Sequence, residues 1–189
     1  MILIIDNYDG CANNIYQLAG RFDPDIRILR HDAVTADGAA AMAPDHIILS
    51  GGSGDPRRAG QANAIVRACA GKIPILGICQ GMRIIGAEYG IMPVKMAEIR
   101  QGKAEMVHVT EPGLLFQGVP DDFRAAFYQS ETITAEAAKA VFRVTAVVGS
   151  EAAAIEHPSL PLFGVMFHPE SFLSSCGDRI MENFLKTTV

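Results

Sequence analysis

The sequence predicts an α/β protein, a three-layer sandwich in which helices flank a mostly parallel central sheet that carries a small antiparallel appendage. Up to about residue 90, short apolar runs alternate with helical segments, an order typical of a parallel sheet covered on both faces. Beyond that point short strands separated by turns indicate antiparallel pairing. The 189 residues contain no internal repeat or low-complexity linker, so one domain over residues 1–189 is expected.

The first half of the chain supplies the parallel strands and the helices between them. Four apolar runs are too short and too rich in branched residues to favour helix, so they are predicted as strands. The first helix is expected to bury Ile15, Leu18, Ala19 and Phe22, which recur at helical spacing. The predicted strands are Ile2–Ile5, Ile26–Leu29, His46–Leu49 and Ile73–Ile78, and the predicted helices are Asn13–Phe22, Ala62–Ala70 and Met82–Tyr89.

The second half is predicted to form the appendage and then return to the sheet. Leu162–Phe167 is an apolar run like the early strands, so the parallel sheet is expected to resume there. A last helix, Asp178–Lys186, presents Ile180, Met181, Phe184 and Leu185 for docking. The short strands expected in the appendage are Val94–Met96, Met106–Val109, Ala125–Tyr128, Val141–Val148 and Ala152–Glu156.

Composition narrows the class of protein. A net charge of -5 and the lack of a Lys/Arg cluster argue against nucleic acid as a partner, and no long uncharged stretch indicates a membrane segment. The sequence opens directly on the strand Met1–Ile5 without a basic leader, so no signal peptide is expected. The four cysteines are scattered without disulfide-framework or ligand spacing. A reducing, cytoplasmic setting is therefore expected.

Cys79 stands between Gly77 and Gly81, where an apolar strand gives way to a helix. Glycine at both positions removes the side chains that would crowd a sharp strand-to-helix turn, and such a turn presents a nucleophile. The helix N-terminus that follows favours thiolate over thiol. A buried, inert cysteine is the alternative. The motif alone favours neither the nucleophile nor the inert cysteine.

The candidate base for this nucleophile lies at the end of the strand Leu162–Phe167. His168 is followed by Pro169, which favours an extended backbone, so the Glu170 side chain projects to the same side as the imidazole. Cys79, His168 and Glu170 would then be nucleophile, base and orienting acid. A capping or metal-binding histidine is the alternative. No second His or Cys stands at ligand spacing, so neither a metal nor another cofactor is expected.

The segment Ser50–Pro56 is rich in glycine and follows a predicted strand. A phosphate-binding loop is one interpretation, although the Lys-Ser/Thr of a P-loop is missing and no G-x-G-x-x-G is formed. An ordinary turn is the other interpretation.

Together, G-I-C-Q-G around Cys79 and G-V-M-F-H-P-E-S around His168 resemble the class I, triad-type glutamine amidotransferases, whose fold is flavodoxin-like. The resemblance runs almost end to end. Three shorter motifs resemble the glutaminase component (component II) of anthranilate synthase and its para-aminobenzoate counterpart. They are I-I-D-N-Y-D at residues 4–9, Q-G-K at 101–103 and H-P-E-S-F at 168–172. The resemblance thus implies an enzyme of tryptophan or folate biosynthesis.

The same resemblance implies roles for individual residues. Cys79 would attack the carboxamide of L-glutamine to form a thioester, and His168 would protonate the departing ammonia. The backbone N–H groups of Gly52 and Gln80 would stabilise the oxyanion. The residues implied at the substrate are Gly52, Ser53, Gly54, Gln80, Arg83, Ser130 and Glu131.

Several positions depart from the family pattern. Arg83 replaces the glutamine that contacts substrate, Gln129 replaces a histidine before Ser130, and Gly10-Cys11 replaces Ser-Phe. Both prolines of the S-P-G-P-G loop are also missing. Arginine offers hydrogen-bond donors only, so Arg83 is predicted to weaken or re-pose glutamine. Its side chain would either hold the α-carboxylate or lie solvated along the helix.

Three functions are compatible with these observations. The favoured one is a glutaminase subunit that delivers ammonia in trans to a separate, chorismate-using synthase, because no acceptor-binding domain is attached. A glutaminase for another acceptor, such as GMP synthetase, is the second, since Ser50-Gly51-Gly52 resembles that branch's S-G-G loop. The third is a weakened regulatory or binding subunit that has kept the scaffold.

Overall fold

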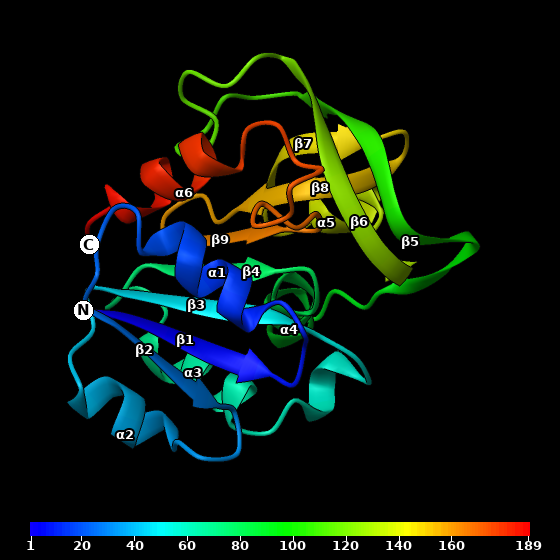
Figure 1. The fold of residues 1–189 in the computed structure, drawn as a ribbon. Coiled ribbons are helices and arrows are strands. Elements are labelled where there is room, and N and C mark those ends of the chain that lie inside the picture. The colour runs from blue at the N-terminus through cyan, green and yellow to red at the C-terminus, as the bar shows by residue number, and fades with distance from the viewer.

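The computed structural model describes residues 1–189 and contains one nine-stranded sheet with the order β2-β1-β3-β4-β9-β8-β7-β5-β6 (Figure 1). The strands are β1 (Ile2–Asn7), β2 (Ile26–Arg30), β3 (His46–Gly52), β4 (Ile75–Ile78), β5 (Val94–Val109), β6 (Asp122–Thr132), β7 (Arg143–Val148), β8 (Glu151–Glu156) and β9 (Leu162–Val165). The helices are α1 (Ala12–Ala19), α2 (Ala36–Ala41), α3 (Gln61–Cys69), α4 (Gln80–Glu88), α5 (Ala135–Ala138) and α6 (Gly177–Leu185), with a short 3-10 helix at Pro56–Arg58.

The parallel half of the sheet confirms the predicted α/β class. Strands β2, β1, β3, β4 and β9 pair in parallel. In Figure 1, α1 crosses in front of these strands, whereas α3 and α4 lie behind them. Helices on both faces exclude water from the central strands, which explains why β1, β3, β4 and β9 are almost wholly apolar and buried.

The predicted antiparallel appendage is an extension of the same sheet. Strand β8 pairs antiparallel with β9, and β7, β5 and β6 continue outward from it. The two short strands expected at Val94–Met96 and Met106–Val109 are one continuous strand, β5. Charged residues lie between the two predicted runs, so the sequence did not indicate a strand there. They are tolerated because this ribbon pairs with β6 and leaves most of its side chains in water.

Helix boundaries differ from the predictions where capping decides them. Helices α2 and α5 were not predicted. Each is capped by a threonine, Thr35 or Thr134, whose hydroxyl accepts the backbone N–H of the third residue of the helix. Helix α1 ends at Ala19, with Gly20 as its C-cap. Phe22 therefore lies beyond the helix and is 40% exposed, contrary to the expectation that it joins the buried face.

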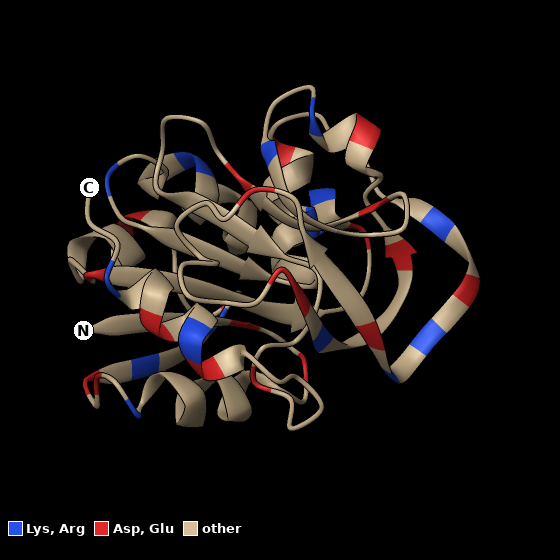
Figure 2. Cartoon of the chain, turned by 90° about the horizontal axis from the view of Figure 1, so that it is seen from above, with Lys and Arg blue, Asp and Glu red and all other residues tan.

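The arrangement brings loops from distant parts of the sequence to one edge of the sheet. The carboxyl ends of β1, β3, β4 and β9 meet there, which is where open α/β sheets bind ligands. Acidic and basic residues are interspersed over the outer elements (Figure 2). No helix combines the length and the apolar character that crossing a bilayer requires.

Candidate active site

Cys79 occupies a sharp turn between β4 and α4. Its backbone has φ 53° and ψ -103°, in the left-handed half of conformational space that a residue with a side chain rarely adopts. Such strain persists only where the surroundings enforce it, and it is typical of functional sites. The N–H of Cys79 donates to the Val165 carbonyl at 2.8 Å, which ties the turn to the end of β9. The geometry is that of a nucleophile elbow.

The two flanking glycines are required by close approach. A Cβ at Gly77 would collide with the backbone of Gly81, and a Cβ at Gly81 would collide with the Leu49 carbonyl oxygen of β3. Backbone atoms cannot step aside as the end of a side chain can. The turn therefore needs glycine at both positions, as the sequence predicted.

His168 follows β9, and two hydrogen bonds to its backbone fix its position. Its N–H donates to the Ala126 carbonyl of β6 at 2.9 Å, and its carbonyl accepts the Ser174 hydroxyl at 2.6 Å. The Nδ1–H of the ring donates to Glu170 Oε1 at 2.6 Å, and both side chains are buried. This contact places the hydrogen of the neutral ring on Nδ1, so that Nε2 is the acceptor.

The surroundings of the ring favour the imidazolium. Burial lowers the pKa of His168, but the Cys11 and Cys79 thiols and the Glu170 carboxylate beside it outweigh that effect and hold the pKa well above its usual value. Nε2 is buried and makes no hydrogen bond. Nε2 of the neutral ring can therefore take a proton from a nearby nucleophile, and the raised pKa favours keeping that proton on the ring.

Tyr128 of β6 is a site residue that sequence reasoning missed. The Cys79 thiol lies 3.9 Å from the Tyr128 carbonyl oxygen, and the Tyr128 ring stands edge-on to the His168 imidazole with ring centroids 5.0 Å apart. Only its position just before Gln129-Ser130 in the sequence connects it with the family pattern. It belongs to the site because β6 runs past the ends of β4 and β9.

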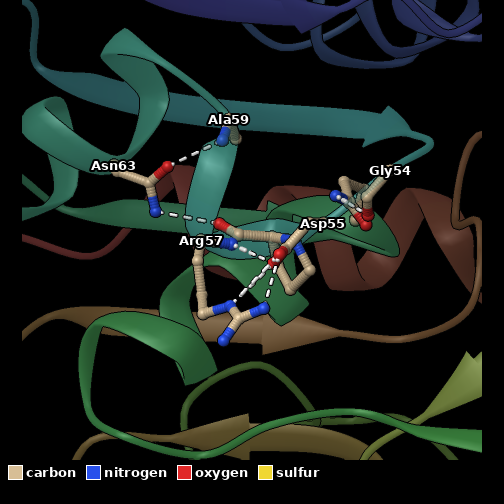
Figure 3. Close-up of polar contacts among 7 residues, drawn as sticks. Gly54, Asp55, Arg57, Ala59 and Asn63 are labelled. Atoms are coloured by element: carbon tan, nitrogen blue, oxygen red, sulfur yellow. Dashed lines mark hydrogen bonds and ion pairs between the residues drawn. The ribbon is translucent and has the colours of Figure 1, made fainter.

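The glycine-rich loop after β3 is tied to the nucleophile's helix. Gln80 Nε2 donates to the Gly54 carbonyl at 3.1 Å, and the Asp55 carboxylate accepts the Arg57 N–H at 2.9 Å (Figure 3). Gly52 has φ 146°, and a Cβ there would lie 2.6 Å from the Asn7 carbonyl oxygen. Gln80 opens α4, so its N–H has no partner within the helix.

Arg83 lies one turn into α4, and the alternative of a solvated side chain is wrong, because Arg83 is only 5% exposed. Its Nη1 donates to Glu131 Oε2 at 3.0 Å, and Nη2 lies 3.5 Å from the Gly52 carbonyl oxygen. Its Nε is buried without a partner. The pair thus joins α4, the end of β3 and the end of β6. Spacing in the sequence did not reveal the pairing with Glu131.

The remaining predicted substrate residues are less closely tied to the site. Ser53 and Ser130 are exposed, and neither side chain forms a hydrogen bond. Gln129 is buried, and its Nε2 donates to Met96 Sδ at 3.5 Å. The side-chain contacts of the site therefore join His168 to Glu170 on one side and Arg83 to Glu131 on the other, while the Cys79 thiol lies beside the Tyr128 carbonyl.

Asp9, two residues after β1, is a half-buried carboxylate at the same edge of the sheet. Its Oδ1 accepts the Cys11 N–H at 3.1 Å, and Oδ2 is buried without a partner. Burial raises the pKa of Asp9, although the Cys11 N–H and His168 oppose the rise. Its place after an apolar parallel strand was the signal that could have predicted it.

Comparisons with known proteins identify the family of this chain. The glutamine amidotransferase class-I family model matches residues 3–188. Anthranilate synthase component 2 of Mycobacterium tuberculosis is 41% identical over 188 residues, 97% of this chain and 81% of that protein. Aminodeoxychorismate synthase component 2 of Serratia marcescens is 35% identical over 190 residues, 98% of this chain and 99% of that protein. A solved GMP synthase chain from Thermoplasma acidophilum superposes with a TM-score of 0.84 at 22% identity, covering 97% of this chain and 91% of that one. The chain therefore belongs to the class-I glutamine amidotransferase family.

Proposed function

We propose that this chain hydrolyses L-glutamine to glutamate and passes the ammonia to a separate, chorismate-using synthase subunit. One observation carries the glutaminase half: the strained Cys79 turn lies at the N-terminus of α4, beside the hydrogen-bonded pair of His168 and Glu170. The transfer of ammonia to a chorismate-using synthase is supported by two relatives. They are named anthranilate synthase component 2, at 41% identity, and aminodeoxychorismate synthase component 2, at 35% identity.

The chemistry follows from the arrangement of donors and acceptors. Cys79 transfers its proton to Nε2 of His168, and the sulfur attacks the carboxamide carbon. The oxyanion that forms accepts the N–H groups of Gln80 and Gly52, each contributing about 3 kcal/mol to the transition state. The C–N bond then breaks and His168 protonates the leaving ammonia. Water, deprotonated by His168, hydrolyses the thioester and releases glutamate.

Arg83 and Glu131 are proposed to recognise the amino-acid end of glutamine. The guanidinium would bind the α-carboxylate, and the Glu131 carboxylate would accept the α-ammonium. An ion pair with its two charges 3.0 Å apart is complementary to a zwitterion, because each charge of the ligand meets its opposite. Ser53, Gly54 and Ser130 would line the same substrate site.

The synthase is proposed to cover the turn that carries the triad. Phe172 follows Glu170 by two residues and is 93% exposed. A large aromatic side chain that is almost wholly exposed in its own chain is typical of an interface anchor. A partner seated on Phe172 would lie beside His168 and Glu170, so that ammonia leaves Cys79 into an enclosed interface.

The other two functions are less well supported. The likeness to a GMP synthase chain is at 22% identity, so it supports the fold and carries no argument for that acceptor. A regulatory role without activity is disfavoured, because the strained turn at Cys79 would have no use in a chain that does not need a nucleophile.

Substitution of Cys79 tests the proposal. Cys79→Ala should abolish the release of ammonia and glutamate, whereas Cys176→Ser, which changes a half-buried cysteine outside the triad, should not. A glutamine-shaped diazo-ketone should label Cys79 and no other thiol in the wild type. Glutamine turnover at the wild-type rate in Cys79→Ala, with its circular dichroism unchanged, would refute the glutaminase assignment.

A further inference from the structure

A second thiol lies beside the proposed catalytic histidine. The Cys11 sulfur, a ring nitrogen of His168 and a carboxylate oxygen of Glu170 lie within 4.8 Å of one another. Cys11 caps the start of α1, whereas the other two residues follow β9. Cys11 also stands where the resembled family tends to carry phenylalanine, so this cluster is a property of this chain rather than of the general pattern.

The cluster contains unsatisfied polar atoms. Glu170 Oε2 and His168 Nε2 are both buried and make no hydrogen bond. The Glu170 side chain is only 1% exposed. A buried carboxylate oxygen without a partner costs free energy, which a bound cation would recover.

The cluster is reached from a cavity that does not include the nucleophile. A cavity of about 460 Å³ lies between the start of α1 and the start of α6. Cys11, Glu170, Ser174 and Asp178 are among its lining residues, and Cys79 is not. A small ion can therefore approach Cys11 and Glu170 from a side that Cys79 does not line.

We propose that Cys11, His168 and Glu170 form a zinc site whose occupation switches the glutaminase off. Thiolate, imidazole and carboxylate are the donors that zinc prefers, and three protein ligands leave a fourth position for water from the cavity. Zinc bonds of about 2.0–2.3 Å place tetrahedral ligand atoms roughly 3.3–3.6 Å apart. The ligand atoms of the observed cluster, which lie within 4.8 Å of one another, would have to move together by roughly 1–1.5 Å to reach that spacing.

Binding would remove the base from the reaction. The Cys11 thiol loses its proton to solvent, and the hydrogen of the neutral His168 ring moves from Nδ1, beside Glu170, to Nε2, so that Nδ1 offers its lone pair to the metal. His168 can then no longer accept the Cys79 proton, and Glu170 no longer orients the ring. The inhibitory effect rests on the proposed glutaminase function, whereas the zinc site itself does not.

Metal binding is measured first, without reference to activity. Cobalt(II) added to chelator-free protein should produce a near-ultraviolet thiolate-to-cobalt charge-transfer band in the wild type and in Cys79→Ala. Cys11→Ser should lose the band, and zinc should displace cobalt from the wild type. A band that persists in Cys11→Ser but disappears in Cys79→Ala would overturn the proposal, because the metal would then be bound by the nucleophile.

Inhibition is measured second, with each variant normalised to its own metal-free rate. Cys11→Ser should raise the zinc concentration for half-inhibition at least tenfold. The matched control Cys176→Ser, another half-buried free cysteine, should stay within about twofold of the wild type. Equal zinc sensitivity of Cys11→Ser and wild type would overturn the inhibitory role. A cobalt band in a protein that never hydrolyses glutamine would refute the proposed function while supporting the metal site.

Discussion

At the scale of single residues, the backbone at Cys79 and the ion pair at Arg83 set the proposed chemistry. A left-handed conformation at a residue other than glycine costs on the order of 1–3 kcal/mol. Here it directs the sulfur away from β4 and leaves the N–H of Gln80 free. Arginine lacks the acceptor that the family's glutamine provides, and Glu131, 3.0 Å away, supplies one. The pairing changes the expectation that Arg83 weakens substrate binding.

Arg83→Gln is expected to raise KM for glutamine about tenfold, or about 1.4 kcal/mol, because Glu131 would then face the α-carboxylate without a balancing cation. The rate of labelling by a glutamine-shaped diazo-ketone should fall in parallel, while alkylation by iodoacetamide, which carries no charge, should not change. Arg67→Gln, at an exposed arginine paired with Glu88, serves as the control. An unchanged or lower KM would mean that Arg83 is not a ligand for substrate.

At the scale of elements, register determines which side chains meet. Ile78 of β4 pairs with Val165 of β9, so the residues that follow each strand emerge side by side at the edge of the sheet. The close packing of α4 against β3 at Gly81 then orients the first turn of the helix.

Gly81→Ala is expected to lower the free energy of unfolding by about 1–3 kcal/mol, because the new Cβ would collide with the Leu49 carbonyl oxygen. Glutaminase activity should fall more than tenfold, since α4 must shift and carry Cys79 with it. Gly10→Ala, where a Cβ would meet open space, is the control. Urea unfolding and an ammonia assay measure the two effects. Wild-type stability in Gly81→Ala would contradict the packing argument.

The contact between β3 and the chain after α6 predicts a pH-dependent stability. The Nε2–H of His46 donates to the Thr187 carbonyl at 3.0 Å, and burial lowers the pKa of His46 although this contact opposes it. Below about pH 6.5 the unfolded chain binds a proton at His46 that the folded protein does not. The free energy of unfolding therefore decreases as the pH is lowered. His46→Gln removes this titration. Wild type should therefore lose more stability than His46→Gln between about pH 7.5 and about pH 5.5, and equal losses in urea unfolding would exclude the effect.

At the scale of the whole molecule, the site lies where the parallel and antiparallel halves of the sheet meet. Strand β6 belongs to the antiparallel half, yet it holds the backbone of His168 through Ala126 and brings Tyr128 against the imidazole. The antiparallel extension is therefore part of the site. Phe172, which is exposed, marks the surface proposed for the synthase.

Phe172→Ala is expected to weaken binding to a chorismate-using synthase at least tenfold, because an aromatic anchor contributes more than about 1.4 kcal/mol to an interface. The melting temperature of the isolated chain should not change, since the side chain is 93% exposed. Leu114→Ala, at another exposed apolar residue, is the control. Calorimetric titration with the synthase measures the affinity, and an unchanged affinity would place the partner on a different face.

The sequence by itself determined the α/β class, the strand-to-helix turn at Cys79 and the contact between His168 and Glu170. Each depends on residues close together in the chain, where spacing and backbone preference are enough. Local signals did not reveal that β5 is one strand, since its pairing with β6 holds charged residues in place. Only the tertiary structure decided that Glu131 pairs with Arg83, that Tyr128 contacts His168 and that Cys11 joins the same cluster. Such contacts join residues 40 or more positions apart, and the order of strands in the sheet, which no local pattern specifies, brings them together.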